Sequence, residues 1–278
     1  MPTFAETADR ITAEELYRRG SVKWTRGGPG AIGAFVAEMD FGAAPAISEA
    51  LRELTARADF GYLSEHEVTE LAQACAAWQH DSYGWTVDPA RVRPLPDVIK
   101  GLEAAITVFS RPGAPVILPT PAYMPFLTWP ARLGREIIQV PMTTSSGRPA
   151  LDLAGLDAAF RRGGHLLILC NPCNPVGRVY TKDELAGLLA DYLPGIGYQP
   201  PEGTYLAWLD CRDLVRDRGI EVSPAEFFRA RARVLLTDGA ACGEAGRGHV
   251  RLNFATPRPI LTEIVRRMAE AVQAGGQG

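Results

Sequence analysis

The sequence predicts an α/β fold built on a parallel β-sheet, and three observations support this class. Segments with the apolar spacing of helices alternate along the chain with short apolar segments. The short segments are continuously apolar, which is typical of strands covered on both faces of a parallel sheet. The chain has 278 residues, of which 46% are hydrophobic and 22% charged, the composition of a globular protein with about two domains.

Helices are predicted where apolar residues recur on one face or where a capping sequence opens a helix. Thr181 to Glu184 and Ser223 to Glu226 are capping boxes, and Pro224 suits the first helical position of the second. The predicted helices cover residues 45–57, 68–78, 98–109 and 181–189, a segment that opens at the second capping box, and a terminal segment from 256 toward 274. The predicted strands cover residues 92–95, 116–118, 137–140, 166–169, 205–209, 234–237 and 250–254.

Charge and hydropathy exclude several classes of partner. The 29 Lys and Arg residues against 32 Asp and Glu give a net charge of −3, which offers no electrostatic reason to expect nucleic acid or an anionic membrane. Residues 1–10 lack the apolar region of a signal peptide, and no apolar run approaches the ~20 residues of a membrane span. The odd, scattered set of five cysteines favours a reducing cytoplasm over a disulfide framework.

Two short motifs are interpreted as structural. Gly28 to Gly33 has the G-x-G-x-x-G spacing of a dinucleotide site, but Pro29 stiffens the turn and residues 34–40 do not form an amphipathic helix pattern. A nicotinamide oxidoreductase is therefore the last-ranked hypothesis. Cys170 and Cys173 have C-x-x-C spacing without a second ligand pair, and prolines surround them, so neither a metal site nor a redox site is predicted.

Polar and aromatic residues follow several predicted strands and suggest one site. Asn171 to Gly177 and Pro119 to Tyr123 each follow a buried strand, where open α/β sheets bind ligands. Leu95 to Lys100 is a strand-to-helix turn whose free N–H groups suit a phosphate. Gly246 to Asn253 places Arg251 on a strand, where its guanidinium could grip a carboxylate. Together they suggest an aromatic, phosphorylated cofactor and a carboxylate substrate.

At these residues the chain resembles the fold type I pyridoxal-phosphate enzymes of the class I/II aminotransferase superfamily, and among them the cystathionine β-lyase-like C–S lyases. The resemblance runs in family order through residues 36–41, 60–62, 95–99, 120–123, 171–177, 204–210 and 246–253. It implies a large domain with an incomplete parallel sheet and an α+β small domain. The implied boundaries are an N-terminal segment at 1–40 associated with the small domain, a partial cofactor-binding large domain at 41–190, and the small domain at 191–278.

The resemblance also implies a role for six residues. The backbone at Asp97 and Val98 would hold the phosphate of pyridoxal 5'-phosphate, and Tyr123 would stack on its ring. Asn174 would hydrogen-bond the phenolic oxygen of the ring. Tyr62 would reach the phosphate of a neighbouring subunit, which implies a homodimer in intact relatives. Arg251 would bind the α-carboxylate of an amino-acid substrate.

The chain departs from the family in its centre. It has neither the Asp that holds the pyridinium nitrogen nor the Ser-x-Lys-type segment whose lysine forms the Schiff base, and an internal deletion near residues 190 and 191 is inferred. Only three lysines exist, Lys23, Lys100 and Lys182, and none has the context of that lysine. No catalytic residue is therefore assigned.

The predicted function is that of a pyridoxal-phosphate-dependent C–S β-lyase or aminotransferase by ancestry, in a chain that is inactive as written. The alternative is a non-catalytic remnant that binds a partner, such as an intact paralogue, through the dimer surface. The first hypothesis expects no lysine-bound cofactor, and the second expects co-purification with a partner.

Overall fold

The computed structural model describes residues 3–58, 60–144, 149–177, 197–198 and 204–274. The chain divides into two compact units, one formed by Met1–Gly42 with Thr107–Gly278 and the other by Ala43–Ile106. We call them the larger and the smaller unit. The domain boundaries expected from the sequence stay a prediction.

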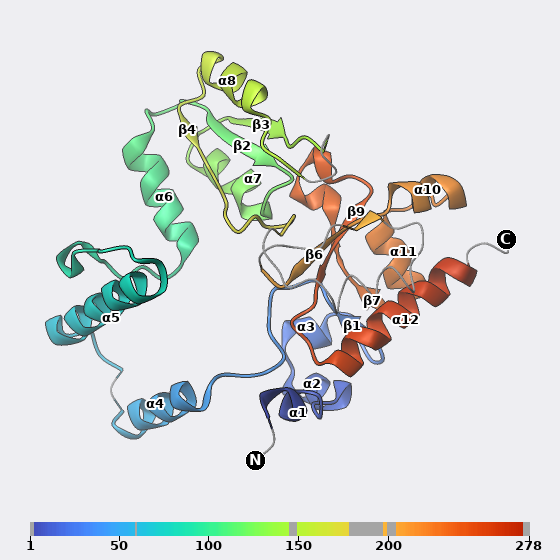
Figure 1. Cartoon of the computed structure of the whole chain (residues 1–278), viewed down its shortest axis with the longest axis horizontal. Coiled ribbons are helices and arrows are strands. Elements are labelled where there is room, and N and C mark those ends of the chain that lie inside the picture. Colours follow the sequence, from blue (N-terminus) through green and yellow to red (C-terminus); the bar gives the residue numbers. More distant parts are fainter. Residues whose placement is uncertain (1–2, 59, 145–148, 178–196, 199–203, 275–278) are drawn as a thin grey trace. The chain divides into compact units, whose positions relative to one another are not determined.

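A three-stranded parallel sheet forms one half of the larger unit. Its strands are β2 (Val116–Thr120), β3 (Ile137–Pro141) and β4 (Leu166–Leu167), in the order β3-β2-β4 (Figure 1). The central strand β2 is buried along its whole length, as its continuous apolar sequence predicts. Helices α7 (Met124–Arg132) and α8 (Leu153–Arg161) pack against this sheet. The α/β class and its parallel sheet are confirmed.

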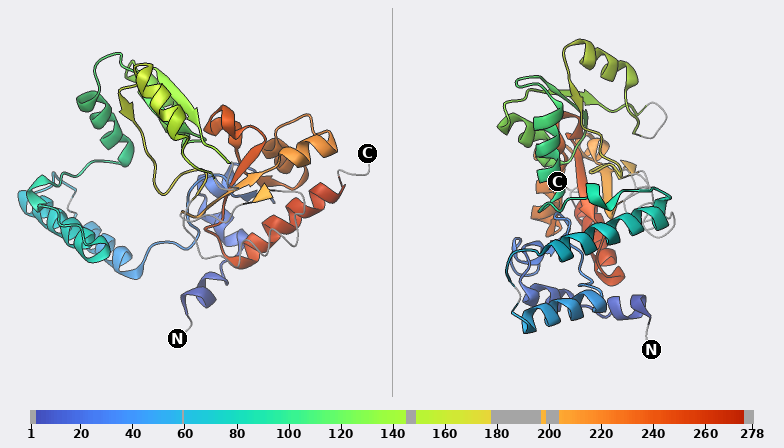
Figure 2. Two further views of the ribbon diagram at one scale, coloured as in Figure 1. Left: turned by 45° about the horizontal axis from the view of Figure 1, so that its top comes forward. Right: turned by 90° about the vertical axis from the view of Figure 1, so that its left-hand side faces the viewer.

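An antiparallel sheet forms the other half of the larger unit. The strands β5 (Gly197–Tyr198), β6 (Leu206–Asp210), β9 (His249–Asn253) and β8 (Thr237–Asp238) follow one another in that order. The helices of this half are α10 (Arg212–Arg218), α11 (Pro224–Arg231) and the terminal helix α12 (Arg258–Ala274), which runs along the sheet in Figure 2. Short 3-10 turns cover Gly239–Cys242 and Glu244–Gly246. Apolar residues of β6, β9, α11 and α12 share one core.

The N-terminal residues join this core. Helices α1 (Phe4–Ala8), α2 (Ala13–Arg19) and α3 (Val22–Thr25) precede β1 (Ile32–Gly33), which pairs in parallel with β7 (Val234–Leu235). Trp24 and Ile32 are buried in the same cluster as Phe228. No helix begins between Gly33 and Pro45, so the G-x-G-x-x-G segment lacks the helix that a dinucleotide site needs.

The smaller unit consists of helices with little buried surface. It contains α4 (Pro45–Ala56), α5 (Glu65–Tyr83), the 3-10 turn Pro89–Arg91 and most of α6 (Val98–Phe109). Within its described residues only Ala72 and Ile106 are buried. The exposed large apolar residues are Ile47, Leu51, Phe60, Tyr62, Leu63, Leu71, Trp78, Tyr83, Trp85, Leu95 and Val98.

Two predicted strands differ from the observed ones for identifiable reasons. Residues 92–95 are irregular, because Pro94 has no N–H to donate to a neighbouring strand. The single strand predicted at 234–237 is divided, because β7 pairs with β1 whereas β8 pairs with β9. The chain therefore changes sheets at Leu236. The helix predicted at 181–189 lies outside the described residues.

Candidate functional site

The centre of the candidate site is the guanidinium of Arg251 on β9. This arginine is only 3% exposed. Its Nη1 donates to Oδ1 of Asn174 at 3.0 Å, and its Nη2 donates to the carbonyl of Phe35 at 2.8 Å and to Oγ1 of Thr237 at 3.2 Å. These contacts join the loop after β4, the segment after β1 and strand β8 at one side chain.

The positive charge of Arg251 is buried, and no carboxylate in the described part of the chain pairs with it. Among the described residues, Nε of Arg251 has no hydrogen-bond partner, and no carboxylate forms an ion pair with Arg251. Burial lowers the pKa of Arg251, and neighbouring Cys242 and Tyr123 oppose that shift. Because an arginine keeps its charge in proteins, this position favours an anionic ligand.

Tyr123 shares a cavity with Arg251. It lies between β2 and α7, and its ring contacts Phe126 edge-to-face with centroids 5.4 Å apart. The cavity has a volume of about 770 Å³. Its lining includes Phe35, Tyr123, Thr237 and Arg251. An aromatic ring and a buried cation therefore line one space, an arrangement that suits a ring-shaped ligand and a carboxylate.

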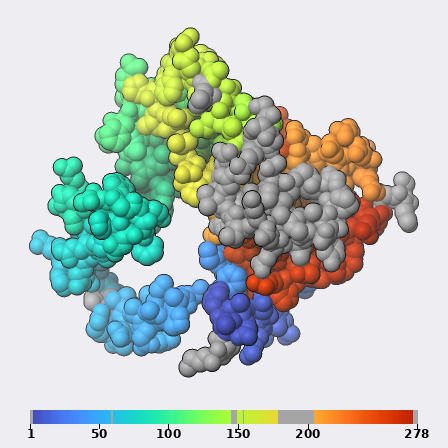
Figure 3. Space-filling model, in the orientation of Figure 1, coloured from blue at the N-terminus to red at the C-terminus, as the bar shows by residue number. Residues whose placement is uncertain are grey.

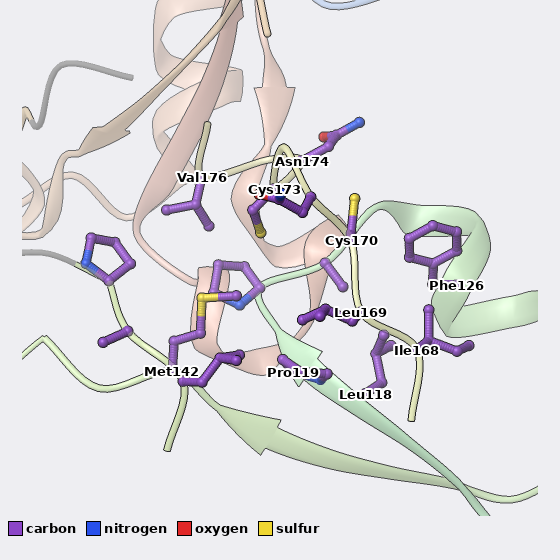
Figure 4. Close-up of a pocket in the computed structure, with 16 residues that line it drawn as sticks. Leu118, Pro119, Phe126, Met142, Ile168, Leu169, Cys170, Cys173, Asn174 and Val176 are labelled. Atoms are coloured by element: carbon purple, nitrogen blue, oxygen red, sulfur yellow. The ribbon is translucent and has the colours of Figure 1, made fainter. Parts of the chain in front are cut away.

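Asn174 lies at the edge of a second, smaller cavity of about 260 Å³ (Figure 4). Leu118, Phe126 and Ile168 contribute apolar walls, whereas the amide of Asn174 points away from them. Since Oδ1 of Asn174 accepts from Arg251, its amide NH₂ faces elsewhere as a donor. Cys170 and Cys173 line this cavity, and all five cysteines of the chain are free.

The remaining predicted residues lie in the smaller unit. Oδ1 of Asp97 accepts a hydrogen bond from the backbone N–H of Lys100 at 2.9 Å and so caps α6. Val98 begins that helix with 83% of its surface exposed, and Tyr62 is fully exposed. The structure brings together Tyr123, Asn174 and Arg251. The roles of Asp97, Val98 and Tyr62 stay predictions.

Both described lysines are engaged in ion pairs. Nζ of Lys23 lies 2.8 Å from Oδ2 of Asp40 and donates to the carbonyl of Glu38 at 3.0 Å. Burial lowers the pKa of Lys23, and Asp40 opposes that shift. Nζ of Lys100 lies 2.7 Å from a carboxylate oxygen of Glu103 on α6. Lys182 lies outside the described residues.

The described residues therefore fit some of the groups of pyridoxal phosphate and its substrate. The aromatic face of Tyr123, the amide of Asn174 and the cation of Arg251 suit a ring and a carboxylate. Of the described lysines, Lys23 is 1% exposed in its ion pair with Asp40, and Lys100 is paired with Glu103. Among the described residues no cluster of His, Cys, Asp and Glu could hold a metal ion, and no described helix is long and apolar enough to span a membrane.

Sequence reasoning missed two partners of Arg251. The backbone carbonyl of Phe35 carries no side-chain signal at all. Thr237 lies directly opposite Arg251 in the pairing of β8 with β9, and only the strand register reveals this.

The chain belongs to the aminotransferase class I and II family, whose model matches residues 36–192. A cystathionine beta-lyase of Corynebacterium glutamicum is 36% identical over 182 residues, which cover 64% of this chain and 47% of the relative. The structure of a proposed PLP-dependent beta-cystathionase from Corynebacterium diphtheriae is similar with a TM-score of 0.82 at 28% identity, covering 95% of this chain and 98% of that one. A PLP-bound C–S lyase from Staphylococcus hominis, 18% identical with a TM-score of 0.84, shares the fold over 98% of this chain and 99% of its own. The expected fold type and the C–S lyase branch are confirmed.

One alignment also shows a difference in length. A proposed cystathionine beta-lyase of Mycobacterium tuberculosis is 27% identical over 405 positions, which cover 95% of this chain and 98% of the relative. Because the chain has 278 residues, at least 127 of the 405 positions have no counterpart in it. The match is therefore interrupted by positions that this chain lacks.

Proposed function

We propose that the chain descends from a pyridoxal-phosphate-dependent C–S β-lyase, keeps the part of the site that binds an amino acid, and does not turn it over. The observation that carries this proposal is the buried charge of Arg251, held by Asn174, Phe35 and Thr237 beside the ring of Tyr123. A carboxylate would complete this arrangement with charge-assisted hydrogen bonds.

The residues of the site have distinct proposed roles toward the cofactor. When bound, pyridoxal phosphate supplies an electron sink for amino-acid chemistry. Tyr123 would offer its face to the ring, and the amide of Asn174 would donate to the ring oxygen. Asp97 and Val98 at the start of α6 would bind the phosphate, to which Tyr62 of a second subunit would add a contact.

The absence of turnover follows from the lysines and from the interrupted alignment. Lys23 is held in a buried ion pair, and Lys100 is paired on an exposed helix. The family match ends at residue 192, close to the inferred deletion at residues 190 and 191, which lie outside the described residues. We infer that the missing positions include the lysine segment. A cytoplasmic location agrees with the free cysteines.

The test is to add pyridoxal phosphate to the purified protein and record the visible absorbance of a lysine-bound cofactor. Borohydride reduction followed by peptide mass spectrometry then locates any adduct, and thiol or oxo-acid release from amino-acid substrates measures lyase and aminotransferase activity. We expect neither a specific adduct nor turnover, with the Corynebacterium glutamicum relative as positive control. A stoichiometric adduct on one of the three lysines together with turnover would refute the proposal.

A second candidate function is that of a non-catalytic remnant that binds a partner. The observation that favours it is the set of exposed aromatic side chains in the smaller unit, including Trp78, Tyr83 and Trp85, which lie on and after α5 (cyan in Figure 3). Exposed apolar surface of this kind marks interaction sites. The partner would be a second copy or an intact paralogue.

A further inference from the structure

We propose that the cavity beside Arg251 accepts an amino acid with a second, distal carboxylate, and that Arg26 binds this second carboxylate. The inference rests on the proposed function, in which Arg251 holds the α-carboxylate. It goes further by assigning the chemical class of the side chain that the cavity selects.

Arg26 and Arg251 approach the same residue of the cavity wall. Arg26 follows helix α3, and its Cζ lies 5.2 Å from the centre of the Phe35 ring. The carbonyl oxygen of Phe35 accepts a hydrogen bond from Nη2 of Arg251 at 2.8 Å. Both arginines line the cavity of about 770 Å³. One residue thus separates the two guanidinium groups, its ring touching one and its carbonyl the other.

Two of the other three charged residues of the cavity wall neutralise each other. Glu226 forms a bidentate ion pair with Arg229 at 2.6 and 2.8 Å. Asp238 accepts a hydrogen bond from the backbone N–H of Ala240 at 2.9 Å. Arg26 and Arg251 therefore outnumber the single remaining carboxylate, Asp238. The cavity favours a ligand with more negative than positive charge.

The donors of Arg26 are available to a ligand. Its described contact is the face of Phe35, which holds a guanidinium plane without using its N–H groups. Nowhere in the described chain does the side chain of Arg26 donate a hydrogen bond or pair with a carboxylate. A planar fork fixed by stacking suits bidentate binding of a carboxylate.

The experiment compares ligands of nearly the same shape and different tail charge. Isothermal titration calorimetry of the full chain measures the affinities of L-glutamate and L-2-aminoadipate against that of L-glutamine. We expect one of the two dicarboxylic amino acids to bind about tenfold more tightly than L-glutamine, as a charge-assisted hydrogen-bond pair predicts. Arg26→Gln should abolish this preference, so that the charged and neutral tails bind with equal affinity.

The matched control is Arg132→Gln. The guanidinium of Arg132 also stacks on an aromatic ring, with its Cζ 4.8 Å from the centre of Trp129, but Arg132 does not line the cavity. This variant should keep the preference of the unmodified protein, and circular dichroism confirms that both variants fold.

The outcomes separate the two proposals. Equal affinity for charged and neutral tails, or a preference that survives Arg26→Gln, overturns the role of Arg26 and leaves that of Arg251 standing. No binding of any of the three amino acids overturns both. Arg251→Gln should weaken all three ligands by a similar factor, because every one of them carries the α-carboxylate.

Discussion

At the scale of single residues, Lys23 shows how a titratable group can be structural rather than catalytic. Its Nζ lies 2.8 Å from Asp40, and the indole N–H of Trp24 donates to the other oxygen of that carboxylate at 2.8 Å. Each charge is thereby compensated inside the protein. A lysine held in this way is bound to its partner and is not free to attack a carbonyl group.

Lys23→Met is expected to lower the free energy of unfolding by about 3–5 kcal/mol, because it leaves the Asp40 carboxylate buried without its counter-ion. Urea denaturation followed by tryptophan fluorescence measures the change. The control is Arg216→Met, which removes an exposed partner of Asp213 and should cost less than about 1 kcal/mol. Equal and small effects of both substitutions would contradict this interpretation.

At the scale of elements, the position of the short strand β1 shows why residue 33 is a glycine. Gly33 pairs with Leu235 of β7 while its other side faces α3. A Cβ added at Gly33 would lie 1.7 Å from the carbonyl oxygen of Lys23, which is backbone and cannot swing aside. The absence of a side chain at Gly33 thus allows α3 and β1 to pack closely together.

Gly33→Ala should therefore destabilise the larger unit by about 1–3 kcal/mol through overpacking. Gly61→Ala is the comparison, since an added Cβ there meets nothing within 4 Å, and it should change the stability by less than about 0.5 kcal/mol. Thermal unfolding of both variants tests the difference. If Gly33→Ala melts like the unmodified chain, the close approach is not a constraint.

At the scale of the whole molecule, the two units differ in how much apolar surface they bury. The larger unit has a continuous core drawn from β6, β9, α11 and α12, whereas the described part of the smaller unit buries only Ala72 and Ile106. Because the smaller unit exposes many large apolar side chains, we expect the protein to cover them by associating with a second copy or another protein.

Analytical ultracentrifugation tests whether the protein self-associates. We expect a dimer at micromolar concentration, and dissociation when Trp78 and Trp85 are both replaced by Glu. Val222→Glu is the control, because Val222 is 51% exposed in the larger unit and lies outside the smaller one. A monomeric unmodified chain would contradict self-association, and binding of an intact paralogue by that monomer would favour the partner-binding alternative.

The sequence by itself determined the fold class, the strands of the parallel sheet, and Tyr123, Asn174 and Arg251 among the residues of the site. Continuous apolar segments predict buried parallel strands, and helix α6 begins and ends where its apolar spacing does. The helix α7 was missed because Pro125 and Pro130 disfavour a helical prediction, although Pro125 sits in its first turn, where no N–H bond is lost.

Only the tertiary structure decided which charges are free. Lys23, Arg26 and Arg251 look alike in the sequence as isolated basic residues. Lys23 is neutralised by Asp40, which is 17 residues away in the chain. Arg251 and Arg26 form no ion pair with a described carboxylate, and they meet at Phe35, 216 residues from Arg251. Such pairings depend on strand register and loop packing between distant segments, and local secondary-structure propensity does not predict them.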